Sequence, residues 1–211
     1  VIGGSNIPGE YVLPTLLATF KARYPEISIT LRIADSREIV RGVLEGTLEL
    51  GAVGAKFDDG QLIYLKLLED ELVLVLPPGH AWASKPVVAL EELVEQPMIL
   101  REVGSGSRKV FEDALHAAGL DSSALTVVAE LGSTEAIRQA VKSGAGVSVI
   151  SLRAIQDDLD RGTLRTVPLE GIRLTRDFYL VYHKNRSRSP LCEAFANFLL
   201  ESVSAKPAGG S

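Results

Sequence analysis

The strongest constraint on the fold is a pattern that occurs four times along the chain. Each time, a short apolar stretch is followed by a small polar stretch with a hydroxyl residue, and then by a helical pattern. In the clearest case, the apolar run 98–100 precedes a glycine- and serine-rich loop, 104–108, and apolar residues then recur at helical spacing over 110–118. Strands that alternate with helices predict parallel sheets. The sequence therefore predicts an α/β fold.

The loops that carry hydroxyl groups are the first candidates for a binding site. In open α/β sheets, ligands bind at the carboxyl ends of strands. The helix that follows also offers unpaired N–H groups and the positive end of its dipole, which suits a small anion. The alternative for each single serine is an ordinary N-cap, which is the common use of serine at that position. The loops together favour one shared cleft, with these candidates: Ser5, Asn6, Ser36, Arg101, Ser105, Ser107, Ser133 and Thr134.

Charged residues near these loops leave two interpretations open. Arg101 and Glu102 either anchor an anionic effector or form a local ion pair that positions the loop. Lys56, which follows a short apolar run, is a weaker candidate for a cation in the cleft. The three histidines lie far apart without metal-ligand spacing, so no metal site and no cofactor are expected. No nucleophile, base and orienting residue group together, so no catalytic residue is expected.

The composition narrows the class of protein. The chain has 211 residues and a formal net charge of −5, whereas a protein that grips nucleic acid over a broad face usually has basic excess. No apolar run approaches the roughly 18 residues of a membrane span, so no membrane partner is expected. The single cysteine, Cys192, excludes an internal disulfide and is expected to be buried. The chain starts at Val1 and ends in a Gly- and Ser-containing tail, 205–211, which is expected to be disordered; both ends suggest a fragment.

An ordered set of short motifs supports a more specific assignment. The matching stretches are 3–5, 9–14, 20–25, 44–46, 49–51, 77–80, 101–108 and 144–147. On these residues, the chain resembles the effector-binding, or substrate-binding, domain of LysR-type transcriptional regulators over almost all of residues 1–203. The arginine-glutamate and glycine-serine pattern most resembles the sulfur- and selenium-metabolism branch of that family.

The resemblance implies two Rossmann-like subdomains joined by two crossover strands, as in type 2 periplasmic binding proteins. Subdomain I would be residues 1–76 plus 178–204, and subdomain II residues 77–177, with a boundary at Pro77-Pro78-Gly79-His80. A small anionic or polar effector would sit between them and touch the serines and the threonine named above. Where relatives carry hydroxyl residues after the first serine, this chain has Asn6 and Ile7.

The resemblance also implies partners. The regulator would be a cytoplasmic homodimer or tetramer, in which the helix around 16–23 of one chain meets the helix around 111–118 of another. DNA would be contacted only through an N-terminal winged helix-turn-helix, which is absent from this chain. Two other functions on the same fold are a transporter's solute-binding protein and, less favoured, an enzyme; the fold alone does not choose between them.

Overall fold

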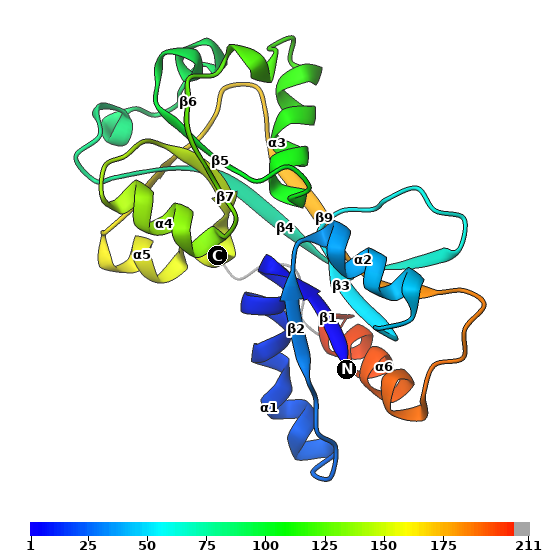
Figure 1. The fold of residues 1–211 in the computed structure, drawn as a ribbon. Coiled ribbons are helices and arrows are strands. Elements are labelled where there is room, and N and C mark those ends of the chain that lie inside the picture. Colours follow the sequence, from blue (N-terminus) through cyan, green and yellow to red (C-terminus); the bar gives the residue numbers. More distant parts are fainter. Residues whose placement is uncertain (205–211) are drawn as a thin grey trace. The chain divides into compact units, whose positions relative to one another are not determined.

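The computed structural model describes residues 1–204 and divides the chain into two compact units. Unit 1 comprises Val1–Glu69 and the C-terminal segment from Asp177, and unit 2 comprises Asp70–Arg176. Two strands run through the boundaries: β4 (Leu62–Leu76) and β9 (Leu174–His183). This confirms the predicted α/β class with two subdomains joined by two crossover strands (Figure 1).

The first boundary differs from the one expected from the sequence. It lies between Glu69 and Asp70, inside β4, rather than after residue 76. The reason is that Leu72, Leu74 and Leu76 are buried in the hydrophobic core of unit 2. The proline-rich stretch 77–80 is therefore a turn within unit 2, and the second boundary places Asp177 in unit 1. The tail 205–211, expected to be disordered, lies outside the described residues.

Unit 1 is built on the strand order β2-β1-β3-β9. Strand β1 is parallel to β2 and β3, and β9 is antiparallel to β3. The other elements of the unit are β1 (Ile2–Ser5), a π-helical turn (Pro8–Val12), α1 (Leu13–Arg23), β2 (Leu31–Ala34), α2 (Ser36–Glu45), β3 (Leu50–Val53) and α6 (Pro190–Ser204). In Figure 1 they are the blue N-terminal elements and the orange-red last helix.

The start of unit 1 depends on glycine. A Cβ atom on Gly4 would lie 2.6 Å from the Cα atom of Gly9, so the turn after β1 can pack this closely only without a side chain. Helix α2 buries Ile39, Val40 and Val43 in the core that it shares with β3. These contacts fix the carboxyl end of β1 beside the first turn of α2, so that Ser5 and Ser36 lie in neighbouring segments.

Unit 2 pairs β4 with β7 and β8 in antiparallel fashion, and β5 with β6 in parallel fashion. Its remaining elements are β5 (Met98–Arg101), α3 (Gly106–Ala117), β6 (Val127–Leu131), α4 (Thr134–Lys142), β7 (Ser148–Ser151), α5 (Gln156–Arg161) and β8 (Arg165–Val167). Four short 3₁₀ turns join them, at Ala81–Ser84, Leu90–Glu95, Ser122–Ala124 and Leu152–Ala154. The strand–loop–helix pattern that predicted the fold is thus present in both units.

An ion-pair cluster ties α4 to α5. The Asp158 carboxylate, with 3 % of its side chain exposed, contacts Arg138 at 2.6 Å and Lys142 at 2.5 Å. It also accepts a hydrogen bond from Thr163 Oγ1 at 2.8 Å. Burial by itself would raise the pKa of Asp158, but these three partners lower it to about 2. The cluster therefore holds a charged carboxylate inside unit 2 at neutral pH.

The last helix packs on the first one. Phe20 of α1 makes edge-to-face contacts with Phe195 and Phe198 of α6, with ring centroids 4.9 and 5.2 Å apart. Cys192 is free and buried on the same helix, as predicted, and burial raises the pKa of its thiol to about 11. Within residues 1–204, the structure has no helix that is long and apolar enough to cross a membrane.

Candidate functional site

The two serines predicted in unit 1 meet at one backbone amide. Ser5 ends β1 and Ser36 begins α2, and their hydroxyl oxygens accept the Gly54 N–H at 3.2 and 3.4 Å. Both side chains are buried. A hydroxyl that accepts this bond still has its own hydrogen to donate. The two serines therefore bring two O–H donors to one point, at the carboxyl ends of β1 and β3.

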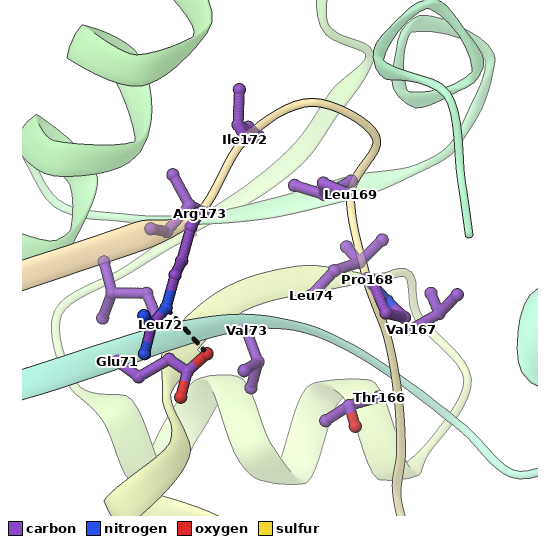
Figure 2. A pocket seen from close by; sticks show the side chains of 11 residues that line it. Glu71, Leu72, Val73, Leu74, Thr166, Val167, Pro168, Leu169, Ile172 and Arg173 are labelled. Atoms are coloured by element: carbon purple, nitrogen blue, oxygen red, sulfur yellow. Dashed lines mark ion pairs between the residues drawn. The ribbon is translucent and has the colours of Figure 1, made fainter. Parts of the chain in front are cut away.

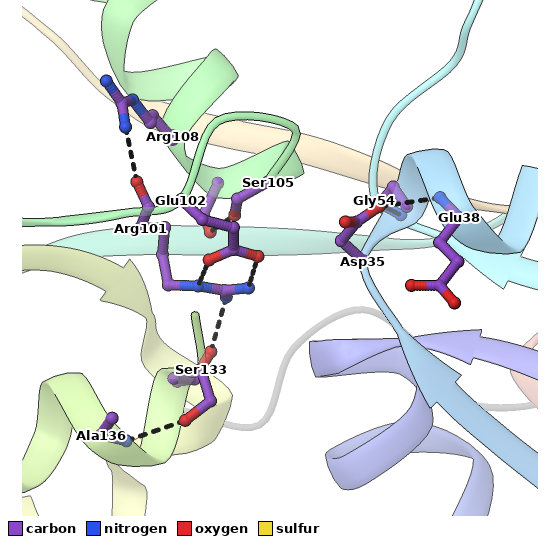
Figure 3. Close-up of polar contacts among 12 residues, drawn as sticks. Asp35, Glu38, Gly54, Arg101, Glu102, Ser105, Arg108, Ser133 and Ala136 are labelled. Carbon is purple, nitrogen blue, oxygen red and sulfur yellow. Dashed lines mark hydrogen bonds and ion pairs between the residues drawn. The ribbon is translucent and has the colours of Figure 1, made fainter. Parts of the chain in front are cut away.

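Ser36 is not the cap of its helix. The N-cap of α2 is Asp35, whose carboxylate accepts the Glu38 N–H at 2.8 Å (Figure 3). Asp35 and Glu38 have the sequence spacing of a capping box, and the bond to the aspartate is present. Ser36 is thereby left for the contact with Gly54. Of the two residues that follow Ser5, Asn6 is half-buried and Ile7 belongs to the hydrophobic core.

Arg101 and Glu102 form a side-on ion pair in unit 2. The Arg101 Nε and Nη2 groups donate to the two carboxylate oxygens of Glu102 at 2.7 and 2.6 Å. Arg101 Nη1 donates to the Thr134 hydroxyl at 3.0 Å. Only 3 % of the Arg101 side chain is exposed, against 23 % for Glu102. The structure thus shows the local ion pair, one of the two interpretations of this dipeptide, and its arginine also holds the first residue of α4 (Figure 3).

Ser105 and Ser107 form a buried hydroxyl pair at the start of α3. Their Oγ atoms are 3.0 Å apart, and both residues are 4 % exposed. Ser105 occupies the N-cap position by its backbone, but its side chain makes no capping hydrogen bond. In a pair of hydroxyls one donates to the other, which leaves one O–H for a further acceptor. The simple capping interpretation therefore fails for Ser105.

Ser133 is the predicted residue for which capping holds. It is the N-cap of α4, and its Oγ accepts the Ala136 N–H at 3.1 Å (Figure 3). Thr134 follows it, is 1 % exposed and accepts the bond from Arg101. Each unit therefore contains a separate set of predicted residues: Ser5, Asn6 and Ser36 in unit 1, and Arg101, Ser105, Ser107, Ser133 and Thr134 in unit 2.

Sequence reasoning missed a second buried arginine near this group. Arg176 of β9 donates to the Asp70 carboxylate at 3.0 Å, and Ser151 Oγ donates to the other oxygen of Asp70 at 2.6 Å. Burial lowers the pKa of Arg176; Asp70 acts to raise it and the charge of Arg101 lowers it further. The partners are separated by 106 and 81 positions in the chain, so no local pattern could have indicated them.

Lys56, the weaker candidate, contacts an aromatic ring. It follows β3 in unit 1, is exposed, and places its Nζ atom 4.2 Å from the centroid of Tyr179. A lysine over a tyrosine ring is a favourable cation–π arrangement. It lies two residues beyond Gly54, whose backbone amide the two serines of unit 1 share.

Two pockets within the units contain none of the predicted residues. One, of about 220 Å³, lies in unit 2 and is lined by residues 71–74, 166–169 and 172–174 (Figure 2). Its walls are mainly apolar, and Glu71 and Arg173 lie 3.9 Å apart at its edge. The other, of about 340 Å³, lies between β2 and α2 in unit 1. Among the described residues, no group of three His, Cys, Asp or Glu side chains is placed to hold a metal ion.

The chain is similar in sequence to a known family of protein domains. The model of the LysR substrate binding domain matches residues 1–204. A probable RuBisCO transcriptional regulator from Cyanidium caldarium is 34 % identical over 95 % of this chain and 64 % of its own length. A protein of Anaeromyxobacter dehalogenans named phosphonates import ATP-binding protein PhnC is 38 % identical over 97 % of this chain, but over 40 % of its own length. The chain thus spans less than two thirds of these two relatives.

A solved structure matches along its full length. The regulatory domain of CcmR from Synechocystis PCC6803, determined in complex with 2-PG, superposes with a TM-score of 0.89 at 26 % identity. The match covers 98 % of both chains. None of these three proteins is named for sulfur or selenium metabolism, so the branch that the glycine-serine pattern suggested stays a prediction.

Proposed function

Because the chain belongs to the LysR substrate-binding domain family, we propose that it binds a small anionic or polar effector for a longer transcriptional regulator. The choice of ligand rests on one observation, the burial and the hydrogen bonding of the serine hydroxyl groups. Ser5, Ser36 and the Ser105–Ser107 pair are buried, yet none of these serines uses its oxygen to cap its own helix. Buried hydroxyls that are not needed for capping are available as donors to a ligand.

The donors define the chemistry of the ligand. A compact molecule rich in acceptor oxygens, such as a carboxylate or a phosphate, can take several short hydrogen bonds from hydroxyl and backbone N–H groups. Each bond to a charged group contributes about 1.5–3 kcal/mol, and a micromolar dissociation constant needs about 8 kcal/mol. Three or four such bonds are therefore enough for a micromolar effector.

The related proteins supply the ligands to test. The CcmR regulatory domain was solved with 2-PG, so 2-PG is the first choice of effector for this chain. The relative named for phosphonate import adds methylphosphonate as a second choice. Since its match covers only 40 % of that relative, it does not favour a transport role over a regulatory one. No catalytic residue and no cofactor are part of the proposal.

Assembly and DNA contact belong to the longer protein in this proposal. The family resemblance implies that two chains would pair through α1 of one and α3 of the other, in a two-fold arrangement, which is the commonest protein assembly. Pairs of this kind would form a dimer or tetramer in the cytoplasm. Promoter DNA would be held by a segment outside the 211 residues, since this chain is acidic.

The double variant Ser5→Ala/Ser107→Ala tests the proposed ligand site. It removes one hydroxyl from each unit and is expected to weaken 2-PG binding at least tenfold by isothermal calorimetry, because two donors to the anion are lost. The matched control is Ser28→Ala/Ser84→Ala, which removes one exposed hydroxyl from each unit. Equal affinity of both double variants would show that the serines are not ligand contacts, and wild type that binds neither 2-PG nor methylphosphonate would reject the proposed ligands.

A further inference from the structure

Glu102 binds Arg101 in the same way that an anionic ligand binds an arginine. An arginine that recognises a carboxylate or phosphate presents two parallel N–H groups to two oxygens. In this protein the two oxygens belong to Glu102, the next residue along the chain, at 2.7 and 2.6 Å. The guanidinium that an anionic effector would seek is therefore covered by an internal carboxylate.

Glu102 is the member of the pair that is able to leave. Its side chain is 23 % exposed whereas that of Arg101 is 3 % exposed, so rotation of the glutamate returns it to water while the arginine stays in place. The loop need not move with it, because the Glu102 carbonyl accepts the Ser105 N–H at 3.1 Å. Arg101 is held separately, by Thr134 at its Nη1 group.

The surrounding charges favour replacement by an anion over loss of the carboxylate alone. Arg176 lies close enough to Arg101 for the two like charges to influence each other. Asp70 is shared by Arg176 at 3.0 Å and Arg153 at 3.5 Å. Rotation of Glu102 into water would remove its negative charge from the Arg101 guanidinium, which lies within the influence of the Arg176 charge. A small dianion would replace the lost negative charge.

We propose that Glu102 is an internal competitor for Arg101, and that an effector binds by displacing the Glu102 carboxylate from the guanidinium. This inference rests on the proposed function, because it concerns the same group of residues. A tethered competitor acts at a high effective concentration. Weak monoanions at ordinary concentrations therefore fail to displace it, whereas a dianion is attracted more strongly to the guanidinium. Glu102 thus sets the charge specificity of the site and the concentration at which the effector acts.

Glu102→Gln tests the inference with inorganic phosphate as the probe. The substitution keeps the size of the side chain and one acceptor oxygen but removes the competing charge. It is expected to strengthen phosphate binding at least tenfold over wild type, measured by calorimetry and by the phosphate-dependent rise in Tm. The matched control is Glu112→Gln, which removes the same charge from another arginine pair, that of Arg108, in the same unit. The control is expected to bind phosphate like wild type.

A measurement on the wild-type protein covers the case in which the variant does not fold. Glutamate labelled with ¹³C at its carboxyl carbon reports whether Glu102 is paired or solvated. Saturation with 2-PG is expected to move the Glu102 signal to the position of an exposed glutamate. The inference is overturned if Glu102→Gln binds phosphate no better than Glu112→Gln, or if Glu102 stays paired with Arg101 when 2-PG is bound. Failure of wild type to bind 2-PG would instead count against the proposed function, and the phosphate comparison would still decide the role of Glu102.

Discussion

The two units differ in the kind of polar side chain that they bury. In unit 1, the buried polar side chains among the described residues are the neutral Ser5 and Ser36, which share one backbone amide. In unit 2, four charged side chains are buried as well: Asp70, Arg101, Asp158 and Arg176. Neutral hydroxyls fix the directions of hydrogen bonds at low cost, whereas buried charges are costly unless every one is paired. In our proposal, the hydroxyl groups of unit 1 therefore orient the effector by hydrogen bonds, and the charged side chains of unit 2 select for its charge.

The largest expected effect comes from removing a buried partner in unit 2. Asp70→Ala would leave Arg176, whose side chain is 6 % exposed, without the carboxylate that compensates it. Breaking such a pair typically costs about 3–5 kcal/mol of folding free energy. Urea denaturation is expected to show a loss of this size.

An ion pair in unit 1 provides a comparison with the buried Asp70–Arg176 pair of unit 2. Lys66 and Asp177 are 2.7 Å apart, but both side chains are in contact with solvent. Asp177→Ala is therefore expected to change the urea midpoint far less than Asp70→Ala, since exposed pairs contribute little. Equal losses for the two variants would contradict the distinction between the units.

A smaller loss of folding stability is expected when the pH is lowered. The pKa of Asp158 is lowered from 3.8 to about 2 in the folded protein, so its contribution is complete above about pH 5 and is lost progressively as the pH falls to 2 and below. That difference in pKa corresponds to about 2 kcal/mol. The free energy of unfolding should therefore fall by about that amount more in wild type than in Asp158→Asn over this range. Parallel pH curves for the two proteins would show that the α4–α5 cluster does not stabilise unit 2 in this way.

Local patterns in the sequence were sufficient for the class of fold and for most helix starts. The Asp35–Glu38 spacing is that of a capping box, which indicates the start of α2, and the apolar spacing over 110–118 predicted α3. These features depend on residues a few positions apart, which the sequence displays directly. The boundary in β4 was placed too late because the proline-rich stretch 77–80 is more conspicuous than the packing of Leu72 into its core.

The candidate site was only partly accessible from the sequence. The hydroxyl residues could be named, but not which of them are caps, because that depends on whether Asp35 or Ser36 accepts the helix N–H. The convergence of Ser5 and Ser36 on Gly54 joins residues 49 and 18 positions apart. The partners of the Asp70–Arg176 pair are more distant still, so only the three-dimensional structure reveals that the charge of Arg176 acts on Arg101.

The most direct test of the account is an amide NMR titration of the chain with 2-PG. If hydroxyls of both units bind the effector, the Gly54 amide in unit 1 and the Ser107 amide in unit 2 should shift together, with one dissociation constant. Shifts confined to residues 71–74, 166–169 and 172–174, which line the pocket in unit 2, would place the ligand elsewhere and contradict the account.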